Sequence, residues 1–481
     1  MQTLFGADGI RGIIEKYPLR IEDVERLGRA VAAWLRQNDR SPVFLVGADT
    51  RESSHRLKAV LCDGLTRAGI RIVDAGILPT AAISFLIAFK NFFAAGAMVS
   101  ASHNPICENG IKFFDQRGVK IHSDTERAID KFFFGDARLP FEIRRAPGSV
   151  EPDYASQYAH ALAREYHDVD WSSHSVVVDC ANGAAYTVAP QVLQALNVRC
   201  TLLNVSPDGT NINLQAGSES VRNSPRLLAA QLQKYNAQVG IAFDGDADRV
   251  LFVDRANRVY DGDMLLAMLA LRLQAKQQLR QDTVVYTQMS NSGLEQFFKS
   301  NHIFSRLVRN GDKNVTNALL EHDLTLGGEE VGHIIARTDH TRVTGDGLRA
   351  GLMVLNELNR HPDLQLGDLA PGMFKWPQIN VLICLGERTQ ASAGEILGLD
   401  RRIEQTRRAI GDITRLECRP ASTEAAYRIM IEARATPISI LARHALDLSQ
   451  HIQRHLGCAG MSIRILDCVN GGVITPDSWR D

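Results

Sequence analysis

One local pattern occurs three times in this chain and limits the folds it can adopt. A short apolar run that reads as a strand is followed by a polar turn and then a helix, with the strands expected at residues 43–46, 176–178 and 283–287. Strands that alternate with helices form mixed or parallel sheets with helices on both faces. We therefore predict an α/β protein with three related domains.

The length and the C-terminal segment indicate a fourth domain. At 481 residues the chain is too long for one ordinary core. Beyond Trp376 the pattern changes: strands are expected near residues 379–384 and 429–432, followed by an amphipathic helix at 438–455. This segment predicts a smaller α+β domain.

The composition narrows the class of partner. Lys and Arg number 54 and Asp and Glu 55, so the formal net charge of −1 favours a small metabolite over nucleic acid or a membrane surface. The eight cysteines are scattered without a CxxC pair and read as reduced thiols. The N-terminus lacks the pattern of a signal peptide, and no long uninterrupted apolar stretch occurs, so we expect a cytoplasmic protein.

Asp244, Asp246 and Asp248 alternate along a short loop between two apolar runs that read as strands. Three carboxylates on such a loop can converge on one hard cation, which implies Mg²⁺. An EF-hand is not favoured, because its Gly and Glu positions hold Arg249 and Arg255. An acidic hairpin turn is the simpler alternative. Arg249 argues against it, since a guanidinium here can hold the carboxylates or meet a phosphate oxygen.

Ser102 follows an apolar run that reads as the end of a buried strand, and Asn104-Pro105 behind it is a turn signal. Open α/β sheets bind their ligands at such carboxyl ends. His103 could act as a base, but it has no partner visible in the sequence, and no G-x-S-x-G elbow surrounds Ser102. The residues alone leave two readings open: Ser102 is a nucleophile or phosphate carrier, or it is a capping serine.

Six motifs together resemble one known family. They are the loops of Ser102 and Asp244 and the runs Phe5-Gly6-Ala7-Asp8-Gly9-Ile10-Arg11-Gly12, Asn109-Gly110-Ile111-Lys112-Phe113-Phe114, Gly328-Glu329-Glu330-Val331-Gly332-His333 and Thr344-Gly345-Asp346-Gly347. The motifs occur in the same order over most of the chain. In this the sequence resembles the α-D-phosphohexomutase superfamily, most of all its bacterial phosphoglucosamine mutases. The first two runs favour this branch over the phosphomannomutase/phosphoglucomutase branch.

The resemblance implies four domains around a central cleft, each contributing one loop. It implies that Ser102 carries the phosphate and that Asp244, Asp246 and Asp248 bind one Mg²⁺ together with an oxygen of phospho-Ser102. Further residues that it places in the catalytic centre are Lys112, Arg11, His103 and Arg249, and those that it places at the substrate are Glu329, Val331, His333, Arg419, Ser422, Thr423 and Arg428.

Simpler readings exist for several of these residues. Lys112 could carry a proton to or from a sugar hydroxyl if its neighbours lower its pKa, or it could be a solvated surface lysine. Glu329 could be structural, His333 a satisfied loop histidine, and Arg419 and Arg428 solvated strand ends.

Two loops depart from the family pattern. The family's Ser-Gly-Thr-Glu-Pro is here Ala421-Ser422-Thr423-Glu424-Ala425, and a missing hydrogen bond to a charged phosphate is worth about 1.5–3 kcal/mol. Val331 stands where the family usually has a serine that contacts the sugar. Substrate choice is therefore less constrained by the sequence than the class of reaction.

The reaction that the resemblance implies converts glucosamine 6-phosphate to glucosamine 1-phosphate through a phosphoserine and a hexosamine 1,6-bisphosphate. The product would supply amino-sugar nucleotides and cell-wall precursors. A sugar phosphate is the expected partner, without nucleic acid or membrane, and a homodimer is compatible with the resemblance. Two alternatives stay open: a mutase that prefers a neutral hexose phosphate, and a degenerate sugar-phosphate-binding paralogue. Intact Ser102 and the aspartates argue against the second.

The expected domains, named by their loops, are 1–150 (phosphoserine), 151–254 (metal), 255–370 (sugar) and 371–457 (phosphate), with a tail of unknown role at 458–481. Residues 138–152 and 362–377 have the Pro and Gly content of linkers. The cut after Asp254 has no linker signal and rests on the resemblance.

Overall fold

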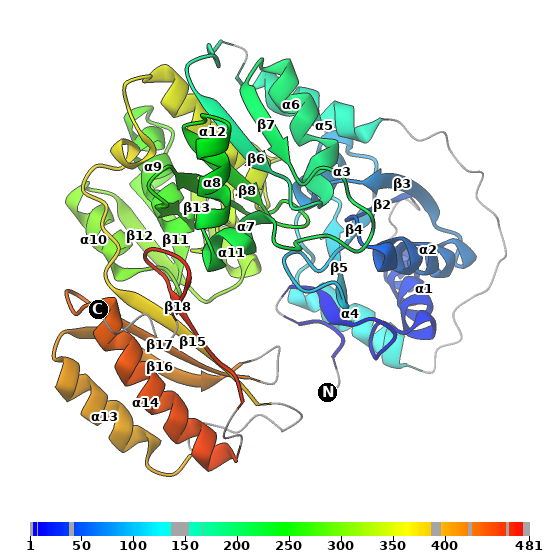
Figure 1. The fold of residues 1–481 in the computed structure, drawn as a ribbon. Coiled ribbons are helices and arrows are strands. Elements are labelled where there is room, and N and C mark those ends of the chain that lie inside the picture. Colours follow the sequence, from blue (N-terminus) through cyan, green and yellow to red (C-terminus); the bar gives the residue numbers. More distant parts are fainter. Residues whose placement is uncertain are drawn as a thin grey trace.

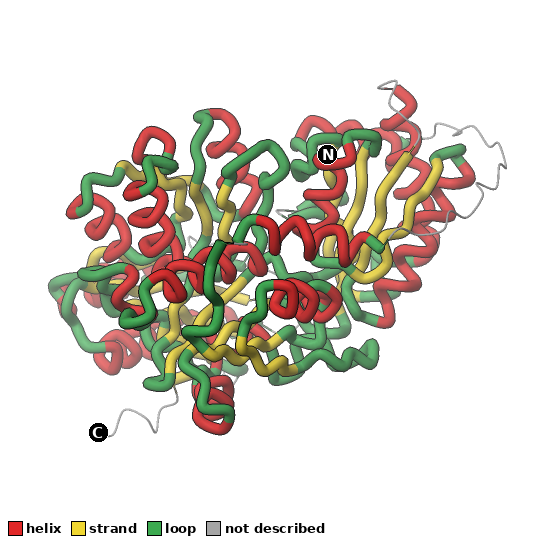
Figure 2. The backbone as a smooth tube through the Cα atoms, turned by 90° about the horizontal axis from the view of Figure 1, so that it is seen from above, coloured by secondary structure: helices red, strands yellow, loops and turns green. Residues whose placement is uncertain are grey.

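The described residues of this chain form four β-sheets, each with its own helices (Figure 1). The computed structural model describes residues 3–6, 8–37, 43–135, 153–166, 168–385, 396–421, 426–457 and 461–474, so the expected linker at 138–152 lies outside the described residues. Seen from above, strands are flanked by helices (Figure 2). The predicted architecture, three related mixed-sheet α/β units and a smaller fourth, is confirmed.

The first sheet has the order β1-β5-β4-β2-β3, with β4, β2 and β3 parallel and the other neighbours antiparallel. All residues of its central strand β4 are buried, and the chain leaves β4 directly into the loop of Ser102. The elements are β1 (Ile10–Ile13), α1 (Ile21–Gln37), β2 (Val43–Ala48), α2 (Glu52–Arg67), β3 (Arg71–Ile77), α3 (Thr80–Lys90), β4 (Ala95–Val99), β5 (Glu108–Asp115) and α4 (Ser123–Phe134).

The second sheet repeats this topology in the order β10-β9-β8-β6-β7, and β8 takes the place of β4. Strand β8 is buried throughout and leads into the aspartate loop. Because β10 pairs with β9, this sheet extends beyond the cut expected after Asp254. The elements are α5 (Tyr154–Arg164), β6 (Ser175–Asp179), the 3₁₀ turn η1 (Ala184–Thr187), α6 (Ala189–Ala195), β7 (Arg199–Leu203), α7 (Gly217–Asn223), α8 (Arg226–Lys234), β8 (Val239–Phe243), β9 (Val250–Asp254) and β10 (Val259–Tyr260).

The third sheet has the order β12-β11-β13-β14, with the last pair antiparallel. The loop with Glu329 and His333 connects β13 to β14. The elements are α9 (Gly262–Ala275), η2 (Arg280–Asp282), β11 (Thr283–Thr287), α10 (Ser292–Ser300), β12 (Phe304–Val308), α11 (Asp312–Glu321), β13 (Leu326–Gly328), β14 (Ile334–Ala336), α12 (Gly347–Arg360) and η3 (Leu366–Leu369).

The fourth sheet is antiparallel throughout, in the order β16-β17-β15-β18-β19. Its first two expected strands and its long helix are confirmed. Strands β18 and β19 lie in the segment that the sequence left without a role; since β18 pairs with β15 along five residues, the sheet continues past residue 457. The elements are β15 (Gln378–Cys384), α13 (Leu399–Ile410), β16 (Ile413–Pro420), β17 (Ala426–Ala433), α14 (Ile438–Leu456), β18 (Ile463–Asp467) and β19 (Val473–Ile474).

The apolar cores divide the molecule differently from the sheets. One continuous cluster of buried side chains runs through the first three units and includes Phe85, Tyr158 and Leu265. Helices α3 and α9 are apolar on nearly all sides, which suits helices packed between layers. The fourth unit has a separate core around Ile379 and Leu441. The first three units are therefore packed as one body.

Polar contacts join the fourth unit to its neighbours. The buried carboxylate of Glu432 in β17 accepts hydrogen bonds from the backbone N and the Oγ of Ser292, at 2.9 and 2.5 Å. Two contacts join the segment of β18 and β19 to α7 of the second unit. Gly472 N donates to the carbonyl of Arg222 at 2.7 Å, and the Arg464 side chain donates to Asn223. Among the described residues, no helix is both long and apolar enough to cross a lipid bilayer.

Candidate active site

Ser102 is held in a fixed, fully buried position at the carboxyl end of β4. Its backbone is left-handed, with φ 55°, and its N–H donates to Ser100 Oγ at 2.8 Å. The hydroxyl donates to the Asp244 carboxylate, and Nδ1 of His103 lies 3.3 Å from Oγ. Two residues that lie 142 positions apart in the sequence are thus in direct contact.

The Ser102 loop is organised by Arg51, which the sequence analysis did not single out. Its buried guanidinium donates to the carbonyl oxygens of Ser102, Asn104 and Pro105, at 3.1, 2.7 and 2.7 Å. Asp49 holds the guanidinium through Nε at 3.0 Å and also accepts from Ser100 Oγ at 2.7 Å. One charged side chain therefore fixes the backbone that carries the hydroxyl.

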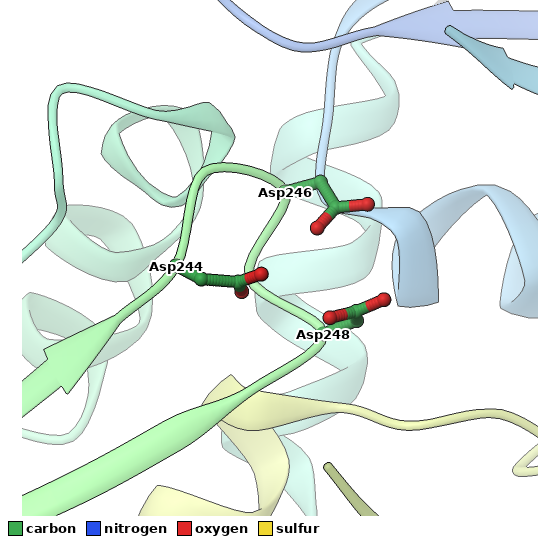
Figure 3. A group of neighbouring side chains, drawn as sticks. All are labelled: Asp244, Asp246 and Asp248. Atoms are coloured by element: carbon green, nitrogen blue, oxygen red, sulfur yellow. The ribbon is translucent and has the colours of Figure 1, made fainter. Parts of the chain in front are cut away.

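The three aspartates occupy the loop between β8 and β9, with their carboxylates near one another (Figure 3). All are buried, and one ligand oxygen from each lies within 4.8 Å of the others. Asp246 Oδ1 and Asp248 Oδ1 have no hydrogen-bond partner among the described residues. Because unpartnered buried carboxylate oxygens are costly, this donor set fits a hard divalent cation.

Lys112 provides the fixed positive charge beside these carboxylates. Its Nζ lies 2.8 Å from Asp246 Oδ2 and 2.9 Å from Asp248 Oδ2. Burial lowers the pKa of Lys112, but Asp246, Asp248 and Asp8 outweigh it and raise the pKa well above its usual value. Proton transfer by Lys112 would require a lowered pKa, and this condition is not met in the structure. The alternative prediction, that Lys112 is a solvated surface lysine, is wrong because the side chain is buried.

The two outer aspartates differ in their proton affinity. Burial and the charges of Asp248 and Asp246 raise the pKa of Asp244 well above its usual value. Burial also acts to raise the pKa of Asp248, but Lys112, His333 and Arg249 outweigh it and lower the pKa. Of these two carboxylates, Asp248 has Lys112 beside it at 2.9 Å, whereas Asp244 lies next to the neutral hydroxyl of Ser102.

Arg11 and Lys120 bring further positive charge to this centre. Arg11 donates to the carbonyl of Ala101 at 2.8 Å and forms an ion pair with Asp8. Lys120, which the sequence analysis missed, forms ion pairs with Asp8 and with Asp312 at the start of α11. The second pair joins the first unit to the third across the site.

His103 and Arg249 flank Ser102 and the aspartate loop. Burial lowers the pKa of His103 well below its usual range, and Arg249 and Arg11 add to this, so His103 is neutral near pH 7. The backbone N of Arg249 donates to Asp244 Oδ1 at 3.1 Å, and its buried Nε has no hydrogen-bond partner among the described residues. Arg249 therefore retains a donor for an anion.

The loop after β13 lies against the second unit, with His333 buried and Glu329 partly buried. Val250 N donates to the carbonyl of Gly332 at 3.1 Å. Burial, Asp312 and Glu330 raise the pKa of Glu329 to about 7. Both ring nitrogens of His333 are buried without a hydrogen-bond partner among the described residues, so a satisfied loop histidine is the wrong reading. Val331, which is partly exposed, offers no polar side-chain atom.

The fourth unit contributes Arg419 and Arg428, which lie opposite each other on β16 and β17. Arg428 is exposed, and Arg419 is partly exposed with its Nε 3.9 Å from Glu417. Ser422 and Thr423 lie outside the described residues. Their roles at a phosphate stay predictions.

Comparisons with known proteins show which family this chain resembles. Models described as phosphoglucomutase/phosphomannomutase alpha/beta/alpha domains I, II and III match residues 2–138, 154–257 and 261–375. A curated phosphoglucosamine mutase of Caldicellulosiruptor bescii is 37% identical over 438 residues, 90% of this chain and 95% of the relative. One from Nitratidesulfovibrio vulgaris is 35% identical over 460 residues, 95% of this chain and 99% of the relative.

Solved structures share the fold. A phosphoglucomutase/phosphomannomutase family protein from Burkholderia thailandensis superimposes with a TM-score of 0.73 at 23% identity, covering 96% of this chain and 98% of the other. The Aspergillus fumigatus N-acetylphosphoglucosamine mutase in complex with GlcNAc-6P and magnesium has a TM-score of 0.56 at 18% identity, covering 78% and 92%. The chain therefore belongs to the phosphoglucomutase/phosphomannomutase family, within the α-D-phosphohexomutase superfamily.

Proposed function

We propose that this protein is a phosphoglucosamine mutase that interconverts glucosamine 6-phosphate and glucosamine 1-phosphate through phospho-Ser102. The observation that carries the proposal is the contact between Ser102 and Asp244, within a buried group of three carboxylates that has unpartnered oxygens and Lys112 beside it. The identity with curated phosphoglucosamine mutases over 90% of the chain supports the amino sugar as substrate.

The reaction consists of two reciprocal phosphoryl transfers. In the first, the bond between Ser102 Oγ and phosphorus breaks and a bond from a sugar hydroxyl oxygen to phosphorus forms. The sugar hydroxyl releases one proton, and the freed Ser102 Oγ takes up one proton, so the serine hydroxyl is restored. The bisphosphate then turns over, and Ser102 Oγ takes the phosphoryl group from the other end of the sugar. Lys112 and Arg11 oppose the charge that spreads over the transferred oxygens. Neutral His103, 3.3 Å from Oγ, is placed to exchange the proton at that oxygen.

One Mg²⁺ completes the proposed centre. Asp244, Asp246 and Asp248 would hold it, together with an oxygen of phospho-Ser102. When bound, the ion supplies positive charge that stabilises the transferring phosphoryl group.

The loop after β13 and the fourth unit bind the rest of the substrate in this proposal. Glu329, when ionised, accepts hydrogen bonds from sugar hydroxyls, and His333 faces the same region. Arg419 and Arg428, with Ser422 and Thr423, hold the phosphate that does not react. Since the sugar presents either end to Ser102, this grip has to serve both orientations.

A mutase for a neutral hexose phosphate is the second candidate, because Val331 gives the sugar loop no hydroxyl to donate or accept. Coupled assays with glucosamine, glucose and mannose 6-phosphates decide between them. We expect the highest kcat/KM with glucosamine 6-phosphate and a requirement for Mg²⁺ and a hexosamine 1,6-bisphosphate. Preference for glucose or mannose 6-phosphate would favour the second candidate, and inactivity with all three would indicate a binding protein.

A further inference from the structure

The open face of the fourth sheet carries three arginines in one row. Strand register places Arg419 of β16 opposite Arg428 of β17, Arg428 opposite Leu382 of β15, and Leu382 opposite Arg464 of β18. Neighbouring side chains on these strands, such as Ile429 and Ile465, belong to the core beneath the helices. The arginine row therefore points away from that core, and its third member comes from the segment beyond Gly457.

This row has an excess of positive charge. Like charges directly opposite each other in antiparallel strands destabilise the pair by roughly 0.2–1 kcal/mol. Glu417 lies 3.9 Å from Arg419 Nε, but both side chains are close to half exposed, so this ion pair compensates little. An anion seated on the row would offset the repulsion.

A cavity of about 190 Å³ lies over the row. Arg419, Arg428 and Arg464 line it from the sheet, and Arg222 lines it from α7 of the second unit. The Oδ1 of Asn380 in the same lining is buried without a hydrogen-bond partner among the described residues. Glu219 and Glu417 also line the cavity, and Glu219 lies 3.8 Å from Arg222 Nη1, so four guanidinium groups face two carboxylates. The remaining excess of positive charge and the unused acceptor suit a phosphate attached to a group that bears hydroxyl or amino hydrogens.

The cavity borders the catalytic centre through Arg222. Its Nη2 lies 3.9 Å from Glu330 of the loop after β13, and its charge is among those that lower the pKa of His103 beside Ser102. Arg222 therefore lines the cavity over the arginine row and also contacts the loop after β13.

We infer that Arg464 and Arg222 join Arg428 in holding the non-reacting phosphate of the hexosamine phosphate. This inference rests on the proposed function. It assigns a substrate-binding role to the C-terminal segment, where Arg464 also donates to Asn223 and so spans the boundary between the fourth and second units. The additional guanidinium groups compensate for the loop at 421–425, which lacks the serine, glycine and proline expected there.

The test measures binding and turnover separately. Calorimetry with glucosamine 6-phosphate and with inorganic phosphate uses Ser102→Ala as the parent, because that variant cannot turn over. Adding Arg464→Gln should weaken binding of glucosamine 6-phosphate by roughly 10-fold or more, as expected for a lost charged hydrogen bond. In the active enzyme the same change should raise KM and leave kcat within about twofold, since the contact exists in ground and transition states. Arg222→Gln should act in the same direction.

Two variants control for indirect effects. Arg402→Gln removes the same charge from α13, where Arg402 pairs with Asp447 at 3.0 Å, and should leave binding unchanged. Asn223→Ala removes the partner of Arg464 but keeps its guanidinium. Unchanged binding in Arg464→Gln, an equal loss in Asn223→Ala, or no binding of either probe by the parent would overturn the inference. If binding depends on Arg464 while wild type lacks mutase activity, the inference stands and the proposed function fails.

Discussion

The buried centre around Ser102 and the arginine row of the fourth unit are built in opposite ways. Ser102, Lys112 and the aspartates are inaccessible, and their contacts connect units that share one apolar core. The arginine row lies on an open sheet face of a unit with a separate core. The difference indicates that phosphoryl transfer requires side chains that are fixed before the substrate arrives. A phosphate-binding site that serves both ends of a sugar instead requires charged side chains that can change their positions.

Ser102→Ala should give the largest effect, because it removes the only proposed phosphate carrier from the buried centre. We expect mutase activity to fall to background. Intact-mass analysis after incubation with a hexosamine 1,6-bisphosphate should show a phosphorylated fraction in wild type and none in the variant. Persistence of that fraction would move the phosphate to another residue and break the assignment of chemistry to this centre.

Arg51→Met tests whether the centre is fixed in advance. Removing the buried guanidinium leaves the charge of Asp49 without its ion-pair partner and several carbonyl oxygens without a donor. We therefore expect a loss of roughly 3–5 kcal/mol in the free energy of unfolding, together with loss of Ser102 phosphorylation. Chemical denaturation and intact-mass analysis measure the two effects. Normal stability with normal phosphorylation would show that the loop does not depend on Arg51.

Asp246→Asn should lower kcat by roughly 100-fold or more without unfolding the protein, since the divalent ion supplies several kcal/mol of charge stabilisation. The matched variant is Asp254→Asn, which lies at the end of β9 outside the metal loop. Titration of activity with Mg²⁺ gives the readout. An unchanged Mg²⁺ requirement in Asp246→Asn would exclude this loop as the ligand set.

Arg428→Ala addresses the open face and should act mainly on KM. We expect KM for glucosamine 6-phosphate to rise roughly 10- to 100-fold while kcat changes less. Steady-state kinetics in both reaction directions provide the measurement. A selective fall in kcat would mean that the fourth unit takes part in the chemical step and does not serve binding alone.

Glu329→Gln should give the smallest effect, a flatter pH profile. With a pKa of about 7, Glu329 carries a proton at pH 6 and loses it by pH 8. Only the ionised form accepts hydrogen bonds at both oxygens, so wild-type kcat/KM should increase across this range. The substrate phosphate, with a second pKa of about 6, titrates identically in both proteins. Profiles of equal steepness would exclude Glu329 as the titrating acceptor.

Short-range patterns were sufficient to predict the α/β class, the position of Ser102 and the aspartate loop. Each is encoded in consecutive residues: a strand, a turn and a distinctive motif. Arg51 and Lys120 were not predicted, because their significance depends on partners far away in sequence, such as Asp312 for Lys120. The run Asp49-Thr50-Arg51 directly after β2 was the available signal.

The direction of the Lys112 pKa and the extent of the fourth sheet also required three-dimensional information. Three carboxylates from two different units surround Lys112, and no sequence spacing reveals their sum. Strand β18 is short and is identified by its pairing with β15 and β19. The position of Arg464 beside the other arginines follows from the strand register, which places it two strands from Arg428 in the same row of the sheet.

The left-handed backbone at Ser102 shows how this fold trades stability for reactivity. A residue with a Cβ adopts φ 55° at a cost of roughly 1–2 kcal/mol, whereas glycine adopts it freely. Selection for folding alone would favour glycine at this position. The serine therefore lowers the local stability, and the surrounding hydrogen bonds offset this cost. Stabilising substitutions in this loop would tend to reduce activity.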